Sequence, residues 1–178
     1  MTAAHVLTGS ALSMKKALRT LVIAVFCLLV VPVKSFALTL ELFDESSLAA
    51  IKKRHEGQAF VLVFWSVRCE FCGQEMSYWR VLKRKHPGVP VIMVSMDPPS
   101  HQQEVGRFIE SHNPGKGEFW IFASDRQQSI RRAVDRNWAD KMGRIYLYDV
   151  GHRRTYSSGV MNRSKVNDWM SVQVCSVR

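Results

Sequence analysis

Four short runs of mainly apolar residues recur along the chain after residue 58. They are rich in Val, Ile, Phe, Trp and Tyr, which favour strands. Runs without regular polar alternation are typical of strands buried on both faces of a sheet. The predicted strands cover residues 59–65, 89–96, 119–122 and 145–148.

Between these runs, apolar residues recur every three or four positions, as they do along one face of a helix. One such helix is expected after Pro98 and Pro99, with Ser100 as its cap and Asn113–Gly115 as its end. A last helix is expected after Ser164, which can cap it. The apolar positions of the three helical segments are Val105, Phe108, Ile109 and His112; Ile130, Ala133, Val134 and Trp138; and Val166, Trp169 and Met170.

The predicted order is strand, helix, strand, helix, strand, helix, strand, strand, helix. Strands that alternate with helices favour an α/β domain in which helices cover both faces of a mainly parallel sheet. Asp149–His152 is predicted to be a tight turn between two antiparallel strands. The C-terminal part is therefore expected to be an antiparallel hairpin followed by a helix.

The N-terminal segment has the layout of a secretory signal peptide. Lys15, Lys16 and Arg19 precede an apolar run over residues 21–33, and Ser35–Ala37 places small residues at the positions read by a signal peptidase. We expect a signal peptide over residues 1–37, with a possible start at Met14, and a single domain over residues 38–178. The alternative is an uncleaved membrane anchor, although the run is shorter than the roughly 20 residues of a membrane-spanning helix.

Composition and charge fit a globular domain with a basic surface. Apolar residues make up 47% of the 178 residues, and the formal net charge is +10. Residues 1–37 hold four of the 25 basic residues and none of the 15 acidic ones, which leaves +6 for the rest. The remaining basic residues are scattered and lack interleaved aromatic side chains, so nucleic-acid binding is not expected.

The candidate chemistry lies in Cys69-Glu70-Phe71-Cys72, which follows the strand over residues 59–65 and opens a predicted helix. Backbone N–H groups and the positive end of the helix dipole favour a thiolate at such a position. A two-residue spacer lets the two sulfurs meet within one helical turn. We expect Cys69 to be the exposed, attacking thiol and Cys72 the inward, resolving thiol.

Two other uses of this cysteine pair remain open at this point. The pair can form a purely structural disulfide, or it can supply half of a zinc site, which needs a second pair of ligands. Of the other cysteines, Cys27 falls in the predicted signal peptide and Cys175 is predicted to lie after the last helix, in a peripheral position. No Pro-x-x-x-Thr-x-x-Cys pattern is present, so a peroxidase is less favoured.

The stretch Phe64–Met76 resembles the active-site segment of the TlpA-like thioredoxin family. The shared pattern is Phe-Trp, three residues, C-x-x-C and then Glu-Met, here at Phe64, Trp65, Cys69, Cys72, Glu75 and Met76. Asp149, Gly151 and Gly159 also match the late turn and glycine of that family. The resemblance implies a thioredoxin-like fold and a periplasmic disulfide reductase.

Three departures from the family pattern fall at positions that can modulate the site. Arg68 replaces the usual Trp before the first cysteine, and Glu70-Phe71 lacks the frequent Pro within the C-x-x-C. The family also has a cis-proline loop before the strand that ends at Asp149. Here that position counts back to Gly143, preceded by Met142. Glycine allows many backbone conformations, so a looser loop and a less shielded dithiol are expected.

Two functions follow as hypotheses. In the first, the chain is an enzyme that exchanges thiols and disulfides with protein partners, needs no organic cofactor and receives electrons from a membrane donor. In the second, it is a binding module whose dithiol holds a soft metal ion such as Cu(I), with little redox turnover. Arg68 and Glu70 act on the Cys69 thiolate in opposite senses, the cation favouring it and the carboxylate opposing it.

Overall fold

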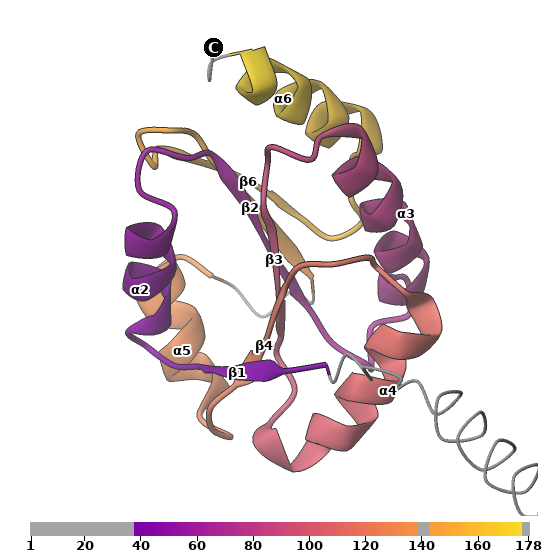
Figure 1. Cartoon of the computed structure of the whole chain (residues 1–178). Helices are drawn as coiled ribbons and strands as arrows, with labels where there is room; N and C mark the ends of the chain where they lie inside the picture. The colour runs from indigo at the N-terminus through magenta and orange to yellow at the C-terminus, as the bar shows by residue number, and fades with distance from the viewer. Residues whose placement is uncertain (1–37, 139–142, 176–178) are drawn as a thin grey trace, which may run out of the picture. The chain divides into compact units, whose positions relative to one another are not determined.

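The computed structural model describes residues 38–138 and 143–175, which belong to one compact unit. These residues form six strands and five α-helices around a single sheet (Figure 1). The strands are β1 (Leu40–Phe43), β2 (Phe60–Trp65), β3 (Val91–Ser95), β4 (Glu118–Phe122), β5 (Arg144–Tyr148) and β6 (Arg154–Ser158). The helices are α2 (Ser47–Arg54), α3 (Cys72–Lys85), α4 (Gln102–His112), α5 (Gln127–Val134) and α6 (Arg163–Cys175), with a short 3-10 helix, η1, at Pro99–His101.

The sheet has the strand order β1-β4-β3-β2-β5-β6. The first four strands in that order are mutually parallel, whereas β5 runs antiparallel to β2, and β6 runs antiparallel to β5. The prediction of a mainly parallel sheet with a C-terminal antiparallel hairpin is therefore confirmed. Asp149–His152 forms the predicted turn, in which the His152 N–H donates to the Asp149 carbonyl at 2.8 Å.

Helices cover both faces of the sheet, as predicted. In Figure 1, α3, α4 and α6 lie on one side, and α2 and α5 lie on the other. Alternate residues of β2 serve the two layers: Val61, Val63 and Trp65 pack with the first group, and Phe60, Leu62 and Phe64 with the second. Because successive strand side chains point to opposite faces, one wholly apolar strand fills both cores.

The structure extends the predicted order at its beginning. Strand β1 and helix α2 precede the first predicted strand. Neither has a strong sequence signal, because β1 has only four residues, with Leu42 57% exposed, and α2 buries only Ser47 and Ile51. Both elements are stabilised by tertiary packing, since Phe43 of β1 and Ile51 of α2 are buried in the same core.

Two predicted helix caps and one predicted end are wrong. Ser100 lies within η1, and α4 begins after it at Gln102. At α6 the cap is Asn162, whose Oδ1 accepts the Lys165 N–H at 3.0 Å, while the Ser164 hydroxyl only donates to that same oxygen. An Asn side chain reaches the third helical N–H as readily as a Ser. The last helix also includes Cys175, which was predicted to follow it.

Candidate active site

The sheet topology brings three chain segments to one edge. Trp65, the last residue of β2, pairs with Ser95, the last residue of β3, and the antiparallel β5 begins opposite Phe64 at Arg144. The loop after β2, the turn after β3 and the residue before β5 therefore lie together. These segments contain the cysteine pair, Asp97 and Gly143, respectively.

Cys69 and Cys72 form a disulfide with an S–S distance of 2.13 Å. Cys72 is the first residue of α3 and is 3% exposed, whereas Cys69 precedes the helix and is half-buried. Phe71, the residue before the helix, makes no side-chain capping bond. Cys72 lies in the first turn of α3, where the helix dipole is positive. The first cysteine is the more accessible, as the sequence analysis predicted.

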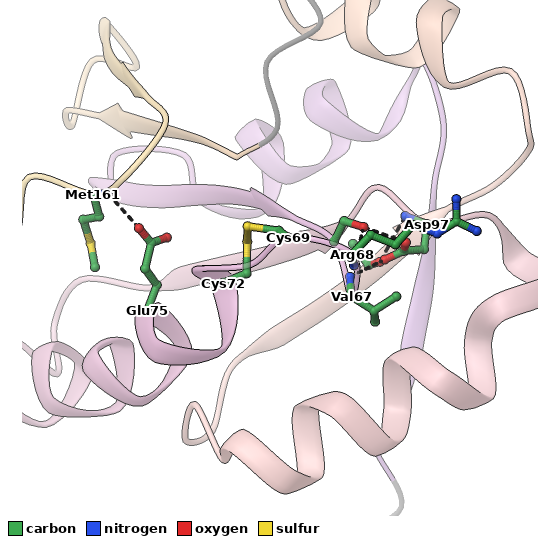
Figure 2. The surroundings of a disulfide bond; sticks show 9 residues. Val67, Arg68, Cys69, Cys72, Glu75, Asp97 and Met161 are labelled. Atoms are coloured by element: carbon green, nitrogen blue, oxygen red, sulfur yellow. Dashed lines mark hydrogen bonds between the residues drawn. A yellow bond between two sulfur atoms is a disulfide. The ribbon is translucent and has the colours of Figure 1, made fainter.

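A buried carboxylate, which the sequence analysis did not single out, holds the loop before Cys69. Asp97 accepts hydrogen bonds from the Ser66 hydroxyl at 2.8 Å, the Val67 N–H at 3.0 Å and the Ser95 hydroxyl at 2.7 Å. The Cys69 N–H then donates to the Ser66 carbonyl at 3.1 Å. Figure 2 shows Asp97 beside Val67 and Arg68, on one side of the disulfide. The sequence signal for Asp97 was its position: it is a charged residue just after the predicted buried strand that became β3.

The disulfide opens into a cavity of about 350 Å³. All of the predicted site residues that the structure describes line it: Arg68, Cys69, Glu70, Phe71, Cys72, Glu75 and Gly143. Arg68 and Glu70 are exposed at its rim, and the Phe71 side chain is 48% exposed. Val160, which the sequence analysis missed, also lines the cavity and is 65% exposed.

Gly143 lies where the family comparison of the sequence placed it, in the cavity with both cysteines. Its φ of +75° is a left-handed conformation that favours glycine, and Gly159 across from it has φ +78°. The two backbones are joined by a hydrogen bond from the Gly159 N–H to the Gly143 carbonyl at 3.2 Å. Met142, the other residue predicted for this loop, falls outside the described residues.

Glu75 lies one helical turn after Cys72 and lines the same cavity. Its carboxylate accepts the Met161 N–H at 2.7 Å, as Figure 2 shows, and thereby anchors the loop that follows β6. Burial raises the pKa of Glu75, against the opposing effects of that hydrogen bond and of Arg163. Because its pKa is raised, the Glu75 carboxyl group can hold a proton beside the two cysteines.

Two further observations concern the described residues only. They contain no group of three or more His, Cys, Asp or Glu side chains that is arranged to hold a metal ion. None of their helices has the length and apolar character needed to span a bilayer. The predicted signal peptide over residues 1–37 falls outside this part of the chain.

In the comparison with protein families, residues 31–156 match the AhpC/TSA family. The chain belongs to the AhpC/TSA family. This family assignment agrees with the TlpA-like, thioredoxin-fold resemblance of the segment around Cys69 and Cys72. The comparison with curated proteins finds no match.

Solved structures similar to this AhpC/TSA chain are described as thiol–disulfide proteins. A thiol:disulfide interchange protein of the thioredoxin family from Chlorobium tepidum is 10% identical, with a TM-score of 0.57, over 69% of this chain and 84% of that one. A secreted thiol–disulfide isomerase from Corynebacterium glutamicum is 16% identical, with a TM-score of 0.56, over 69% and 74%. A secreted Mycobacterium tuberculosis disulfide oxidoreductase homologous to E. coli DsbE is 15% identical, with a TM-score of 0.53, over 67% and 85%.

These similarities establish the fold of this AhpC/TSA member. It has the thioredoxin-like fold of thiol–disulfide oxidoreductases, with a C-x-x-C pair at disulfide distance. The similar proteins reported above are thiol–disulfide oxidoreductases, which are enzymes, in agreement with the expectation drawn from the sequence.

Proposed function

We propose that the chain is an exported thiol–disulfide oxidoreductase that reduces disulfides of periplasmic proteins through Cys69 and Cys72. The observation that carries the proposal is the asymmetric exposure of the pair at the start of α3, within a cavity that opens to solvent. Export rests on the signal-like residues 1–37, and two of the similar structures belong to proteins described as secreted.

The reaction begins with the reduced pair. The Cys69 thiolate attacks one sulfur of the partner's disulfide, that S–S bond breaks, and the released partner thiolate takes up a proton. Cys72 then attacks the Cys69 sulfur of the mixed disulfide and releases the second partner thiolate, which is also protonated. The partner gains two electrons and two protons, and the chain is left with the Cys69–Cys72 disulfide.

Glu75 is placed to assist the second step. The Cys72 thiol must lose its proton before it attacks, and the Glu75 carboxylate shares its cavity. The raised pKa of Glu75 lets it accept this proton and pass it to the departing thiolate. A dithiol partner at the membrane would then reduce the Cys69–Cys72 disulfide and return the chain to its starting state.

Trapping experiments test these roles. In a background with Cys27 and Cys175 changed to Ser, Cys72→Ser should accumulate mixed disulfides with a protein substrate, because the resolving thiol is absent. Cys69→Ser should not, and the variant lacking both cysteines is the matched control. Equal trapping by the two single variants would refute the assignment, and failure of the parent to reduce insulin disulfides would refute the activity.

The alternative function is binding of a soft metal ion by the reduced pair. It is favoured by the absence of side chains at Gly143 and Gly159, which leaves room beside the sulfurs. Titration of the reduced chain with Cu(I), followed by an exchange assay, separates the two functions. Tight binding without exchange would support the metal-binding module, and exchange without tight binding would support the enzyme.

Location can be tested separately. N-terminal sequencing of the protein recovered from an exporting bacterial host should give Leu38 as the first residue. An intact terminus at Met1 or Met14 in the membrane fraction would instead support an anchor.

A further inference from the structure

A second and larger cavity, of about 640 Å³, lies at the other end of α3 from the cysteines. Its walls come from the last turns of α3, the segment before β3 and the loop between α4 and β4. Lys83, in its wall, follows Cys72 by eleven residues, or about 16 Å along the helix axis. This cavity is therefore distinct from the thiol site and has no part in the proposed exchange reaction.

The cavity concentrates positive charge. Arg80, Lys83, Arg84 and Lys116 line it, against a single carboxylate, Glu118. Both oxygens of Glu118 are already engaged, one by His55 at 2.7 Å and the other by Arg54. Among the described residues, none of the four cations forms an ion pair. A concave surface of one charge sign attracts ligands of the opposite sign.

Lys83 is the most enclosed of these cations. Its ammonium group donates to the Lys116 carbonyl at 3.1 Å and lies 5.4 Å from the centroid of the Phe119 ring. Gly117 makes room for it, since a Cβ there would lie 2.7 Å from Nζ. Burial without a carboxylate lowers the pKa of Lys83 to about 8. An anion in the cavity would offset this cost by supplying the missing countercharge.

The arrangement of the cations indicates the kind of anion. Arg80 and Arg84 are one helical turn apart, so their guanidinium groups lie on the same face of α3. Lys83 and Lys116, which also line the cavity, add two further donors. Four cations match a dianion with three terminal oxygens better than a carboxylate, which offers only two. The remaining wall, formed by Pro87, Val89, Pro90 and Val91, is apolar.

We propose that this cavity binds a phosphate ester whose apolar body rests on the proline and valine wall. The phosphate lies among Arg80, Lys83, Arg84 and Lys116. The volume is within the range of small-molecule sites. The ester can be a free molecule or the headgroup of an anionic lipid, since both present the same group.

Phenyl phosphate is a suitable probe, with benzoate as the matched ligand of lower charge. NMR titration of the purified full-length chain should give saturable shifts confined to residues around 80–91 and 115–118. We expect binding about tenfold tighter than that of benzoate, because the dianion makes at least one more charge-assisted hydrogen bond. Lys83→Gln and, separately, the exposed Arg80→Gln should each weaken phenyl phosphate binding about tenfold, while Lys165→Gln on α6 should not.

Equal affinity for phenyl phosphate and benzoate, or unchanged binding in both cavity variants, would overturn the proposal. Sedimentation with phosphatidylglycerol vesicles then shows whether the bound phosphate belongs to a lipid headgroup or to a free ester. Vesicle binding that Lys83→Gln abolishes would assign the phosphate to a lipid headgroup, and its absence alongside phenyl phosphate binding would assign it to a free ester. Insulin reduction by the same variants should be unchanged, so the result does not depend on the thiol function.

Discussion

At the scale of single residues, Lys83 has a measurable effect on stability whether or not a ligand is present. Its pKa is about 8 in the folded chain, against an ordinary value of 10.5. Between these pH values the unfolded chain holds a proton that the folded chain has released. The free energy of unfolding therefore gains a contribution that rises with pH across this window, by up to about 1.4 kcal/mol per pH unit.

Lys83→Met should remove this contribution while keeping the apolar stem. We expect the variant to be more stable than the parent at pH 7, where the folded parent still carries the half-buried charge. The difference should shrink as the pH rises from 8 towards 10. Urea unfolding of both proteins at several pH values measures it, and a difference independent of pH would show that the Lys83 charge is well solvated.

Gly73 is required by close packing rather than by its backbone conformation. A Cβ at this position would lie 2.5 Å from Nε2 of His112. The imidazole cannot easily move, because it stacks on Phe108 at 4.2 Å and its Nδ1 is hydrogen-bonded to the Phe108 carbonyl at 2.9 Å. Helix α3 can therefore approach α4 this closely only with a glycine here.

Gly73→Ala should lower the free energy of unfolding by about 1–3 kcal/mol through overpacking. Combining it with His112→Ala should recover part of the loss, since the two sites are coupled. Gly106→Ala in the middle of α4 is the matched control, because a Cβ there would have no atom within 4 Å beyond its chain neighbours and the backbone of its own helix. That control should be neutral or stabilising by up to about 1 kcal/mol. Similar losses in both alanine variants would contradict the packing argument.

At the scale of elements, the loop between β2 and α3 depends on β3 for its shape. Asp97→Ala should leave the Val67 N–H without its partner and free the Ser66 hydroxyl, at a cost of about 1–3 kcal/mol. Exchange by the remaining folded protein should also slow, because Cys69 is held through Ser66. Asp97→Asn keeps an oxygen for Val67 and should have the smaller effect. Chemical denaturation and insulin reduction give the two quantities, and a stability loss without any change in exchange would show that the loop is held in other ways.

The loop before β5 can be probed at Gly143, although not with proline, the residue that the TlpA-like pattern has at this position. Proline requires φ near −65°, and Gly143 has +75°. Gly143→Pro should therefore be more destabilising than Gly143→Ala. A Cβ at position 143 would contact only the Gly159 carbonyl oxygen, at 3.9 Å. The main cost of Gly143→Ala is therefore the left-handed backbone conformation, which lowers the free energy of unfolding by about 1–2 kcal/mol. Thermal unfolding compares the two, and a Gly143→Pro variant as stable as the parent would show that the loop readily adopts another path.

The elements that sequence predicted best are those with long, uniform apolar runs. Strands β2 and β3 were predicted from their apolar runs. These runs arise because every residue in the two strands is buried. Strand β1 was missed because Leu42 faces solvent, and α2 because two buried residues make no periodicity. The cap of α6 was misplaced because Asn162 and Ser164 can both cap a helix, and only the backbone path decides between them. Ser100 was misplaced because a turn of 3-10 helix precedes α4.

At the scale of the whole molecule, the candidate site was largely predictable because its residues follow one another from Arg68 to Glu75. Gly143, which the family pattern singled out, lines the same cavity. Asp97 and Val160 were not predicted, since each comes from a different loop. Asp97 reaches the Val67 N–H, and Val160 reaches the cavity of the cysteines, only after the sheet has formed. Sequence adjacency reveals one wall of such a site, and topology supplies the others.

The apolar residues form two cores, one on each face of the sheet, and we expect substitutions in the two cores to differ in their effect on exchange. Leu62 is fully buried on the α2–α5 face, whereas Met76 packs on the same face as Cys72. Leu62→Ala should lower the free energy of unfolding by about 2–5 kcal/mol but leave the exchange rate of the folded protein unchanged. Met76→Ala should affect both. Exchange assays below the unfolding transition test this, and slowed exchange in the Leu62 variant would show that the sheet transmits core defects to the site.

Strand β6 ends the sheet, and nearly all of its side chains are exposed. Its outer flank offers backbone N–H and C=O groups on which another strand can be added. Two features oppose the pairing of β6 with a strand of a second copy. They are the polar side chains of β6 and the electrostatic repulsion between copies that are both positively charged. Added salt shortens the range of that repulsion to about 8–10 Å. We therefore expect added salt to lower the protein concentration at which copies begin to associate through β6.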